Sequence, residues 1–137
     1  IHDDQALACA ATGGVVGVNG IGLFLGEDDI SSATMAKHIL HYIDLIGAKH
    51  VGIGIDYFHD TSGDPGAEDD GDDFNATLGG NTDFWPPAQY PGGAVRCAAP
   101  SQMREVAAEL LAQGVPSGEV QGILGGNFKR VAAQVWG

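Results

Sequence analysis

"VGIGIDYFHD", residues 51–60, places an acid directly after five small or apolar residues. The apolar residues predict a buried β-strand, because a strand covered on both faces does not need alternating polar side chains. Asp56 would then lie at the carboxyl end of that strand, which is where parallel α/β enzymes place their active sites. Asp56 is therefore the strongest candidate for a catalytic residue. The alternative is a loop acid that only accepts backbone hydrogen bonds.

Two helices and another strand precede this stretch, with short connections between them. Residues 3–11 predict a short helix, and the uncharged run 15–26 begins as a buried strand with Asn19 near its end. Ser31 or Ser32 can cap a longer helix. The apolar residues of that helix recur at three- and four-residue spacing: Ala36, Ile39, Leu40, Ile43 and Ile46. The order helix, strand, helix, strand is typical of an α/β protein with a parallel sheet.

The last part of the sequence predicts three helices. The first opens at Pro100 and ends at Gly114, the second has Ser117 as its N-cap, and the third has Asn127 as its N-cap. Two strands cannot form a closed barrel or a doubly wound sheet by themselves, because unpaired edges and uncovered apolar faces would remain. We therefore expect the chain to associate with another polypeptide or to be the tail of a larger protein.

The net charge is −12, from 18 acids against 6 bases. A surface of this sign repels nucleic acids and anionic membranes, so neither is an expected partner. No apolar run approaches the ~20 residues of a membrane span. Cys9 and Cys97 are far apart and match no metal-ligand spacing. The sequence does not start with Met, and we expect a processed chain or a fragment.

Residues 57–99 form a long acidic stretch without a convincing helical or strand period. Nine of the 18 acids lie between Asp56 and Asp83, and no Lys or Arg lies between Lys49 and Arg96. A solvated loop explains this composition, and a loop around a cationic centre or a substrate amine is the alternative. The spacing of the acids excludes an EF-hand, whereas an irregular calcium site stays open.

The histidines give few metal-binding or catalytic patterns. His38 and His41 lie three residues apart on the predicted helix, but His41 belongs to the polar face of that helix, which favours a solvated surface over a zinc site. His59, close to Asp56 and Asp60, is the better candidate for a site residue. The sequence contains no P-loop and no Ser-His-Asp or HExxH arrangement.

Three segments, in this order, resemble one family of enzymes. They are DDQALACAATGGVVGVN (3–19), HILHYIDLIGAKHVGIGIDY (38–57) and VQGILGGNFKRVAAQV (120–135). Together they resemble the last third of the membrane (renal) dipeptidase family of zinc metallopeptidases. The GxGxD ending of the strand and the terminal GGNFxRV are the most specific blocks. The similarity extends from about residue 3 to residue 135.

The resemblance implies a (β/α)8 TIM-type barrel. This chain would supply its C-terminal part: the last two strands, strands 7 and 8, with the flanking helices and the C-terminal helices. Residues 1–137 would then be the C-terminal segment of a single dipeptidase-like barrel domain, and residues 57–99 a long acidic loop on the active-site side. A full barrel takes about 250 residues, so the remaining N-terminal part of the barrel is an expected partner.

The family cleaves dipeptides with two zinc ions, which polarise the scissile carbonyl and activate a water. The family's zinc ligands lie upstream of everything that matches here, so the resemblance assigns no metal ligand to this chain. It implies that Asp56 is a catalytic and substrate-binding acid that faces the substrate amine and helps proton transfer to the leaving nitrogen. His59 is a further substrate-binding candidate. A dipeptide is the implied substrate, and a homodimer is an expected assembly.

This sequence also departs from the family. The usual DFDG after the strand is DYFHD here, which displaces the second acid to Asp60 and inserts His59. The loop 61–98 is longer and more acidic than in mammalian members, which is expected to reshape the substrate pocket. We therefore expect part of a membrane-dipeptidase-like zinc hydrolase that is inactive without its upstream part. The alternative is a non-catalytic binding or assembly module whose acidic loop binds a cation.

Overall fold

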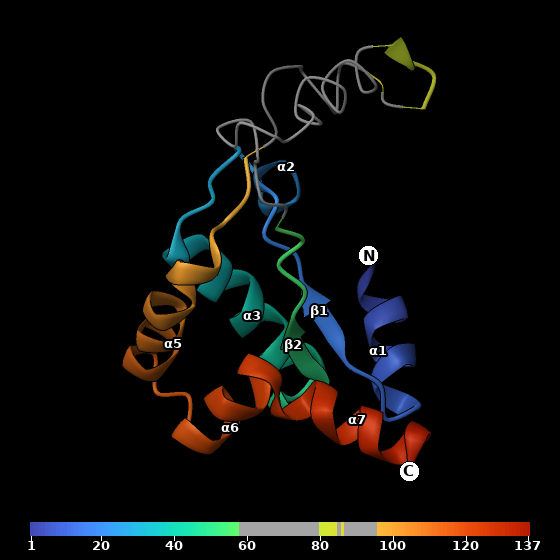
Figure 1. The fold of residues 1–137 in the computed structure, drawn as a ribbon, viewed down its shortest axis with the longest axis vertical. Coiled ribbons are helices and arrows are strands. Elements are labelled where there is room, and N and C mark those ends of the chain that lie inside the picture. The colour runs from blue at the N-terminus through green and yellow to red at the C-terminus, as the bar shows by residue number, and fades with distance from the viewer. Residues whose placement is uncertain (58–79, 85, 87–95) are drawn as a thin grey trace, which may run out of the picture.

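The computed structural model describes residues 1–57, 80–84, 86 and 96–137, and it has an α/β architecture (Figure 1). Strand β1 (Val16–Val18) pairs in parallel with strand β2 (Val51–Ile53), with Val16 opposite Val51 and Val18 opposite Ile53. The connection between them contains a helix that returns the chain to the start of the sheet, as parallel pairing requires. The predicted α/β class with a parallel sheet is therefore confirmed.

The two regular strands are shorter than predicted, but their backbones stay paired beyond the last strand residues. The amide of Gly54 donates to the carbonyl of Val18 at 3.0 Å. The amide of Gly20 donates to the carbonyl of Ile55 at 3.1 Å. The strand ends therefore remain side by side up to the residue before Asp56.

Only one face of this small sheet is fully packed. Val16, Val18 and Val51 are buried, whereas Gly17 between the two valines of β1 is exposed. The prediction of strands covered on both faces therefore holds for β2 at Val51 and Gly52, which are both buried, and fails for β1 at Gly17. The reason is that the helices pack over the valine face, while the glycine face receives little more than one aromatic ring, described below.

Three helices precede β2. They are α1 (Asp3–Ala11), α2 (Gly22–Leu25) and α3 (Ser32–Ile46). Ser31 is the N-cap of α3, and its side chain accepts a hydrogen bond from a backbone amide of the first turn. Gly47, with φ +81°, ends α3, because this left-handed conformation suits a residue without a Cβ. A short 3₁₀ turn, η1 (Ala48–His50), then leads directly into β2.

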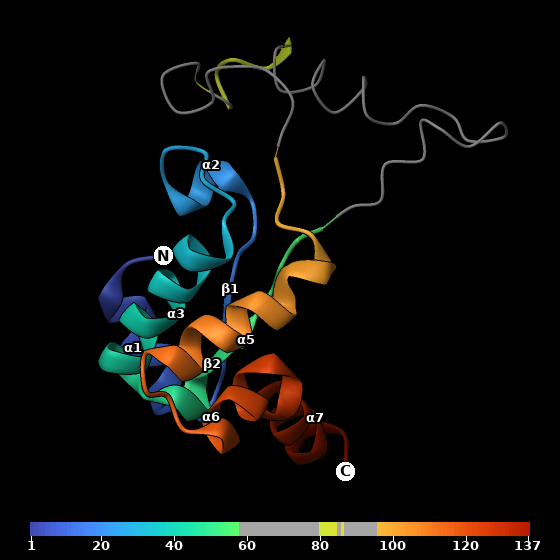
Figure 2. The same cartoon turned by 90° about the vertical axis from the view of Figure 1, so that its left-hand side faces the viewer.

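Helix α5 (Met103–Ala112) follows the 3₁₀ turn η2 (Pro100–Gln102) and packs along α3 (Figures 1 and 2). Helix α3 contacts both strands, and side chains of α3, α5 and β2 meet in the main apolar core. The largest fully buried side chains all belong to this core: Met35, Ile39, Val51, Val106, Leu110 and Ile123. Burial of each such side chain stabilises the fold by about 1.5–3 kcal/mol.

The chain ends in three helical segments that lie where the strands begin (Figures 1 and 2). They are α6 (Ser117–Gln121), the π-helical turn η3 (Gly122–Gly126) and α7 (Asn127–Trp136). The predicted N-cap of α6 is wrong by one residue, since Pro116 is the cap and Ser117 is the first helical residue. Proline suits this place because its ring holds φ near −65°, and its φ here is −57°.

Asn127 does not cap α7 as predicted, because the helical backbone is interrupted earlier, at Gly125 (φ +154°), and Gly126 already has helical φ and ψ. Its buried side chain instead donates from Nδ2 to the carbonyl of Ala48 at 2.8 Å and to that of Val51 at 2.7 Å. Both carbonyls lie at the start of β2. Asn127 therefore satisfies buried backbone groups and fastens the C-terminal helices to the sheet.

Arg130 fastens both strands at the same end. Its Nη1 donates to the carbonyl of Gly13, three residues before β1, at 3.1 Å. Its Nη2 donates to the carbonyl of Lys49, just before β2, at 3.0 Å. The planar guanidinium of Arg130 thus links α7 to the segments that lie just before the two strands.

The ring of Phe128 lies against the glycine face of the sheet. A Cβ added to Gly52 would lie 2.4 Å from Cε2 of Phe128, closer than any side chain allows, and one added to Gly17 would lie 3.5 Å from Cζ of Phe128. Gly52 is therefore required by the close approach of this ring, and not by an unusual backbone angle. Gly52 of the strand motif GxG and Phe128 of the terminal motif GGNF therefore pack against each other.

We predict that Gly52→Ala lowers the free energy of unfolding by about 1–3 kcal/mol, because the added methyl group overpacks the contact with Phe128. Urea unfolding of the protein, followed by circular dichroism, measures this change. Shrinking the ring in the double variant Gly52→Ala with Phe128→Leu should recover part of the loss.

Gly118→Ala is the matched control, because a Cβ at Gly118 meets no atom within 4 Å and the residue lies in helix α6. It should leave stability unchanged or raise it by up to about 1 kcal/mol. Equal unfolding midpoints for Gly52→Ala and Gly118→Ala would contradict the packing of Phe128 on the sheet.

Candidate functional site

The carboxyl ends of β1 and β2 bring two polar side chains together. Asn19 follows β1, Asp56 follows the paired end of β2, and Nδ2 of Asn19 donates to Oδ2 of Asp56 at 3.2 Å. Asp56 is exposed and Asn19 is half-buried. The predicted location of Asp56 at the end of the second strand is therefore confirmed, whereas a catalytic role is not tested by this geometry.

The backbone of Asp56 has φ +55°, the left-handed region that residues other than glycine rarely occupy. Asp and Asn are the side chains that best tolerate this conformation, because their short polar groups can form local hydrogen bonds. The turn ends the strand and sets the direction of the carboxylate. Glu27 and Asp28, in the loop after α2, have the same positive φ, so the backbone angle alone does not mark Asp56 as a site residue.

A segment distant in sequence crosses the strand ends and completes the site. The amide of Ala98 donates to the carbonyl of Gly20 at 2.8 Å, and Ile21 forms an isolated antiparallel bridge with Cys97. This segment follows the long acidic stretch. The return of Cys97 to the strand ends was not predicted, because no periodic pattern leads up to it in the sequence.

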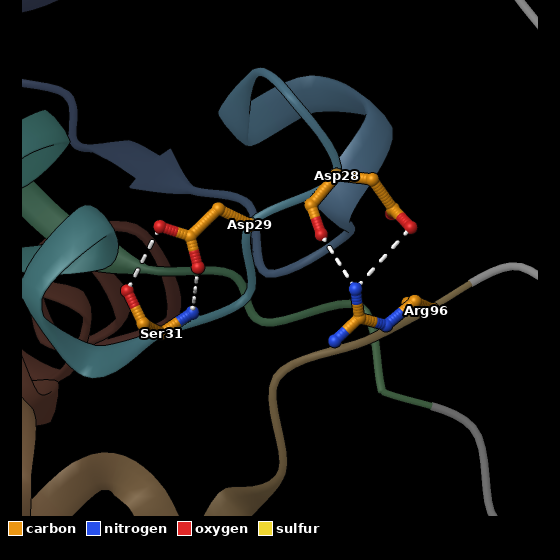
Figure 3. A network of polar contacts seen from close by, with 4 residues as sticks. All are labelled: Asp28, Asp29, Ser31 and Arg96. Atoms are coloured by element: carbon orange, nitrogen blue, oxygen red, sulfur yellow. Dashed lines mark hydrogen bonds and ion pairs between the residues drawn. The ribbon is translucent and has the colours of Figure 1, made fainter.

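Arg96 anchors this segment to the loop after α2 (Figure 3). Its Nη1 donates to the backbone carbonyl of Asp28 at 3.0 Å and lies 3.5 Å from Oδ2 of the same residue. In addition, the amide of Gly22 donates to the carbonyl of Arg96 at 2.9 Å. The ion pair is partly exposed, so its contribution to stability is small, and its effect is mainly to fix where the segment lies.

The carboxylate of Asp29, the neighbour of Asp28, accepts hydrogen bonds from residues at the start of α3 (Figure 3). Its carboxylate accepts hydrogen bonds from the hydroxyl of Thr34, and from the amide of Ser31 at 3.0 Å and its hydroxyl at 3.1 Å. These bonds, with Thr34 first, hold the pKa of Asp29 below its usual range. Asp29 therefore acts in helix capping, and we assign it no catalytic task.

Cys97 is electrostatically linked to Asp56. Partial burial raises the pKa of the Cys97 thiol above its usual range, and the negative charge of Asp56 raises it further. A reactive cysteine needs the opposite, a lowered pKa that yields a thiolate at neutral pH. Cys97 is therefore a protonated neighbour of the site and not a nucleophile.

The histidines of the described residues have separate partners. Nε2 of His38 lies 2.9 Å from the carbonyl of Leu25, and Nε2 of His41 lies 3.3 Å from Oδ1 of Asp3. His50 is buried, with Nδ1 2.8 Å from the carbonyl of Gly14. None of these three rings reaches Asp56 through a described contact.

Within residues 1–57, 80–84, 86 and 96–137, no group of three or more His, Cys, Asp or Glu side chains could hold a metal ion. His59, Asp60 and most of the acidic stretch 57–99 lie outside the described residues. The predicted substrate-binding role of His59 and the alternative of a cation-binding loop therefore lie outside them too.

A pocket of about 750 Å³ runs along the edge of β1 that does not face β2. Its lining includes the five consecutive residues from Val15 to Asn19. Successive side chains of a strand point to opposite faces of the sheet, so a pocket that contacts all five follows an edge of the sheet and not one face. Further lining residues come from the N-terminus, α1, α2 and α3: Ile1, Cys9, Leu23, Phe24, Leu25, His38 and Tyr42. The pocket is mostly apolar, with Asn19 at its strand-end side.

A family model described as membrane dipeptidase (peptidase family M19) matches residues 1–72. The matched part contains both strands, Asn19 and Asp56, and thus the whole sheet and both polar strand ends. No solved structure matches the chain significantly. None of the helices in the described ranges is long and apolar enough to cross a membrane.

The link between Cys97 and Asp56 predicts a chemical test that is independent of any activity. In a Cys9→Ser background, Asp56→Asn should increase the rate of Cys97 alkylation by iodoacetamide at pH 8 severalfold. The reason is that loss of the carboxylate charge lowers the thiol pKa and increases the thiolate fraction. Burial still raises the pKa in this variant, so the reaction stays slower than that of an exposed cysteine.

Asp44→Asn, on the exposed side of α3, removes the same charge elsewhere and should leave the alkylation rate unchanged. Mass spectrometry of the labelled peptide follows the reaction. If Asp56→Asn and its parent react at the same rate, Asp56 does not face Cys97 in solution.

Proposed function

The chain belongs to the membrane dipeptidase family, and we propose that it forms the C-terminal part of a zinc-dependent hydrolase that cleaves dipeptides. The family match indicates a peptidase lineage. The observation that supports the rest is the exposed carboxylate of Asp56 at the carboxyl end of a parallel strand, inside the matched segment. Enzymes with parallel α/β barrels place catalytic residues at this end of their strands.

We further propose that β1 and β2 are the last two strands of a (β/α)8 barrel. Residues 1–137 are then one C-terminal segment of a single domain, with 57–99 as a loop on the active-site side. The pocket along the free edge of β1 supports this proposal, because an additional parallel strand would pair there and cover the apolar lining. The remaining N-terminal part of the barrel is the partner that supplies this strand.

A second uncovered surface supports the same partner. Val135 and Trp136 of α7 are 70% and 84% exposed, and residues of α7 line an apolar hollow of about 460 Å³. Its lining residues are Phe128, Lys129, Val131, Ala132, Val135 and Trp136. Apolar surface of this extent on one amphipathic helix favours contact with further protein.

The described residues do not fit a zinc site, because they bring no three metal-binding side chains together. Under this proposal the ligands of the two zinc ions therefore come from the rest of the barrel. This chain contributes an acid, an amide and a thiol at one side of the site, and all of its steps concern binding and proton transfer.

Hydrolysis of a dipeptide requires a proton on the leaving nitrogen and a group that recognises the substrate amine. A carboxylate can serve both needs, since it accepts a hydrogen bond from the amine and exchanges protons with a neighbouring nitrogen. Asp56 is exposed and held at one oxygen by Asn19, which leaves the other oxygen for the substrate. We therefore assign Asp56 as the acid–base and amine-binding residue.

We predict that Asp56→Asn in the complete protein lowers kcat for dipeptide hydrolysis by about 10²–10⁴, the usual contribution of general acid–base catalysis. Zinc content, measured by elemental analysis, should stay near that of the unmodified protein. Asparagine tolerates the left-handed backbone at this position, so the fold should be preserved.

Asp44→Asn is again the matched control, and its kcat should be unchanged. Full activity of Asp56→Asn would refute the role of Asp56. Complete loss of zinc in that variant would instead identify Asp56 as a metal ligand. If the complete protein neither binds zinc nor cleaves dipeptides, the proposed activity is wrong.

A further inference from the structure

Two hydrogen bonds hold the side-chain amide of Asn19, one at its oxygen and one at its nitrogen. The backbone amide of Ile21 donates to Oδ1 at 2.6 Å, and Nδ2 donates to Oδ2 of Asp56 at 3.2 Å. Because a backbone amide can only donate, the contact with Ile21 determines which atom of the Asn19 side chain is oxygen. The NH₂ group must therefore point toward Asp56.

The backbone on both sides of this contact is held by the sheet. Gly20 donates to the carbonyl of Ile55 at 3.1 Å and accepts from the amide of Ala98 at 2.8 Å. Asn19 and Asp56 are thus the flanking neighbours of a paired segment and do not belong to a free loop. The left-handed turn at Asp56 then directs the carboxylate toward the amide.

We propose that Asn19 is a positioning residue that holds Oδ2 of Asp56 and keeps Oδ1 available for proton transfer to the leaving nitrogen. The inference rests on the proposed function and names a further residue of the same site. Within the described part of the chain, Oδ1 of Asp56 has no hydrogen-bond partner. A carboxylate fixed at one oxygen presents the other in one place, which is the geometric condition for efficient proton transfer.

The first test is a double-mutant cycle in the complete, zinc-loaded protein, with kcat and KM measured for dipeptide hydrolysis. Asn19→Ala should lower kcat by about 10- to 100-fold with little change in KM, since it acts on the proton-transfer step. If Asn19 acts through Asp56, the double variant Asn19→Ala with Asp56→Asn should be no slower than Asp56→Asn alone.

The second test uses Asn19→Asp, which keeps the shape of the side chain and the oxygen that accepts from Ile21. It replaces only the NH₂ donor, and it places a second carboxylate beside Asp56. The acidic limb of the kcat/KM profile should then move to higher pH, because a like charge opposes ionisation of Asp56. Cys97, the titratable neighbour of Asp56 among the described residues, stays protonated in this range because its pKa is raised.

Gln113→Ala, at the exposed end of α5, deletes the same amide far from the strand ends and should leave kcat and the profile unchanged. Unfolding midpoints and zinc contents are measured for every variant. If Asn19→Ala fails to fold, Asn19→Asp still gives the decisive profile, because it retains the contact with Ile21.

Two results would overturn the inference while the proposed function stands. One is an inactive Asp56→Asn together with an Asn19→Asp variant whose pH profile is unmoved. The other is a cycle in which the effects of Asn19→Ala and Asp56→Asn on kcat simply multiply, as expected for an independent structural role. A fully active Asp56→Asn would overturn the inference together with the role of Asp56, whereas a complete protein that cleaves no dipeptide would overturn the proposed function.

Discussion

The parallel pairing of β1 with β2 is the constraint on which the rest of the structure depends. It aligns Val16 with Val51 and thereby brings together side chains that lie 37 residues apart in the sequence, Asn19 and Asp56. The register is secured at both ends of the sheet. Where the strands begin, Asn127 and the guanidinium of Arg130, both in α7, donate hydrogen bonds to backbone carbonyls. At the finish, the segment 96–98 crosses the strands and is itself anchored to the loop after α2.

In this arrangement, the residues that stabilise the fold and the polar residues of the candidate site lie at opposite ends of the sheet. The valine face and the strand starts are packed, capped and hydrogen-bonded, whereas the polar groups gather at the strand finishes, where the carboxylate is exposed. Such a division is the general pattern of parallel α/β enzymes, in which one end of the sheet supports the fold and the other presents catalytic groups. Under the proposed function, the described residues supply one side of the site: the carboxylate of Asp56, the amide of Asn19 that orients it and the protonated thiol of Cys97.

Much of this could be predicted from the sequence, because the decisive patterns are local. The helix stripes, the capping Ser31 and the two apolar strands predicted the parallel sheet and the end at which Asp56 lies. Asn19 was expected near the end of the first strand, so its closeness to Asp56 follows once the pairing is known. The contacts of Asn127 could not be predicted, since a capping residue and a buried donor share the same sequence signal. The return of Cys97 to the strand ends depends on tertiary structure after a long stretch without periodicity, and no local rule predicts it.

The most direct test of the account compares hydrogen exchange at the backbone amides of β1 and β2 in two samples. One is the polypeptide of residues 1–137 alone, and the other is a longer protein that also contains the preceding part of the barrel. Unpaired strand edges and a glycine face that Phe128 covers only in part should let these amides exchange quickly in the isolated polypeptide, and the completed barrel should slow their exchange by orders of magnitude. Strong and equal protection in a monomeric sample of residues 1–137 would show that the two-stranded unit is complete, and would contradict the barrel on which the proposed function is built.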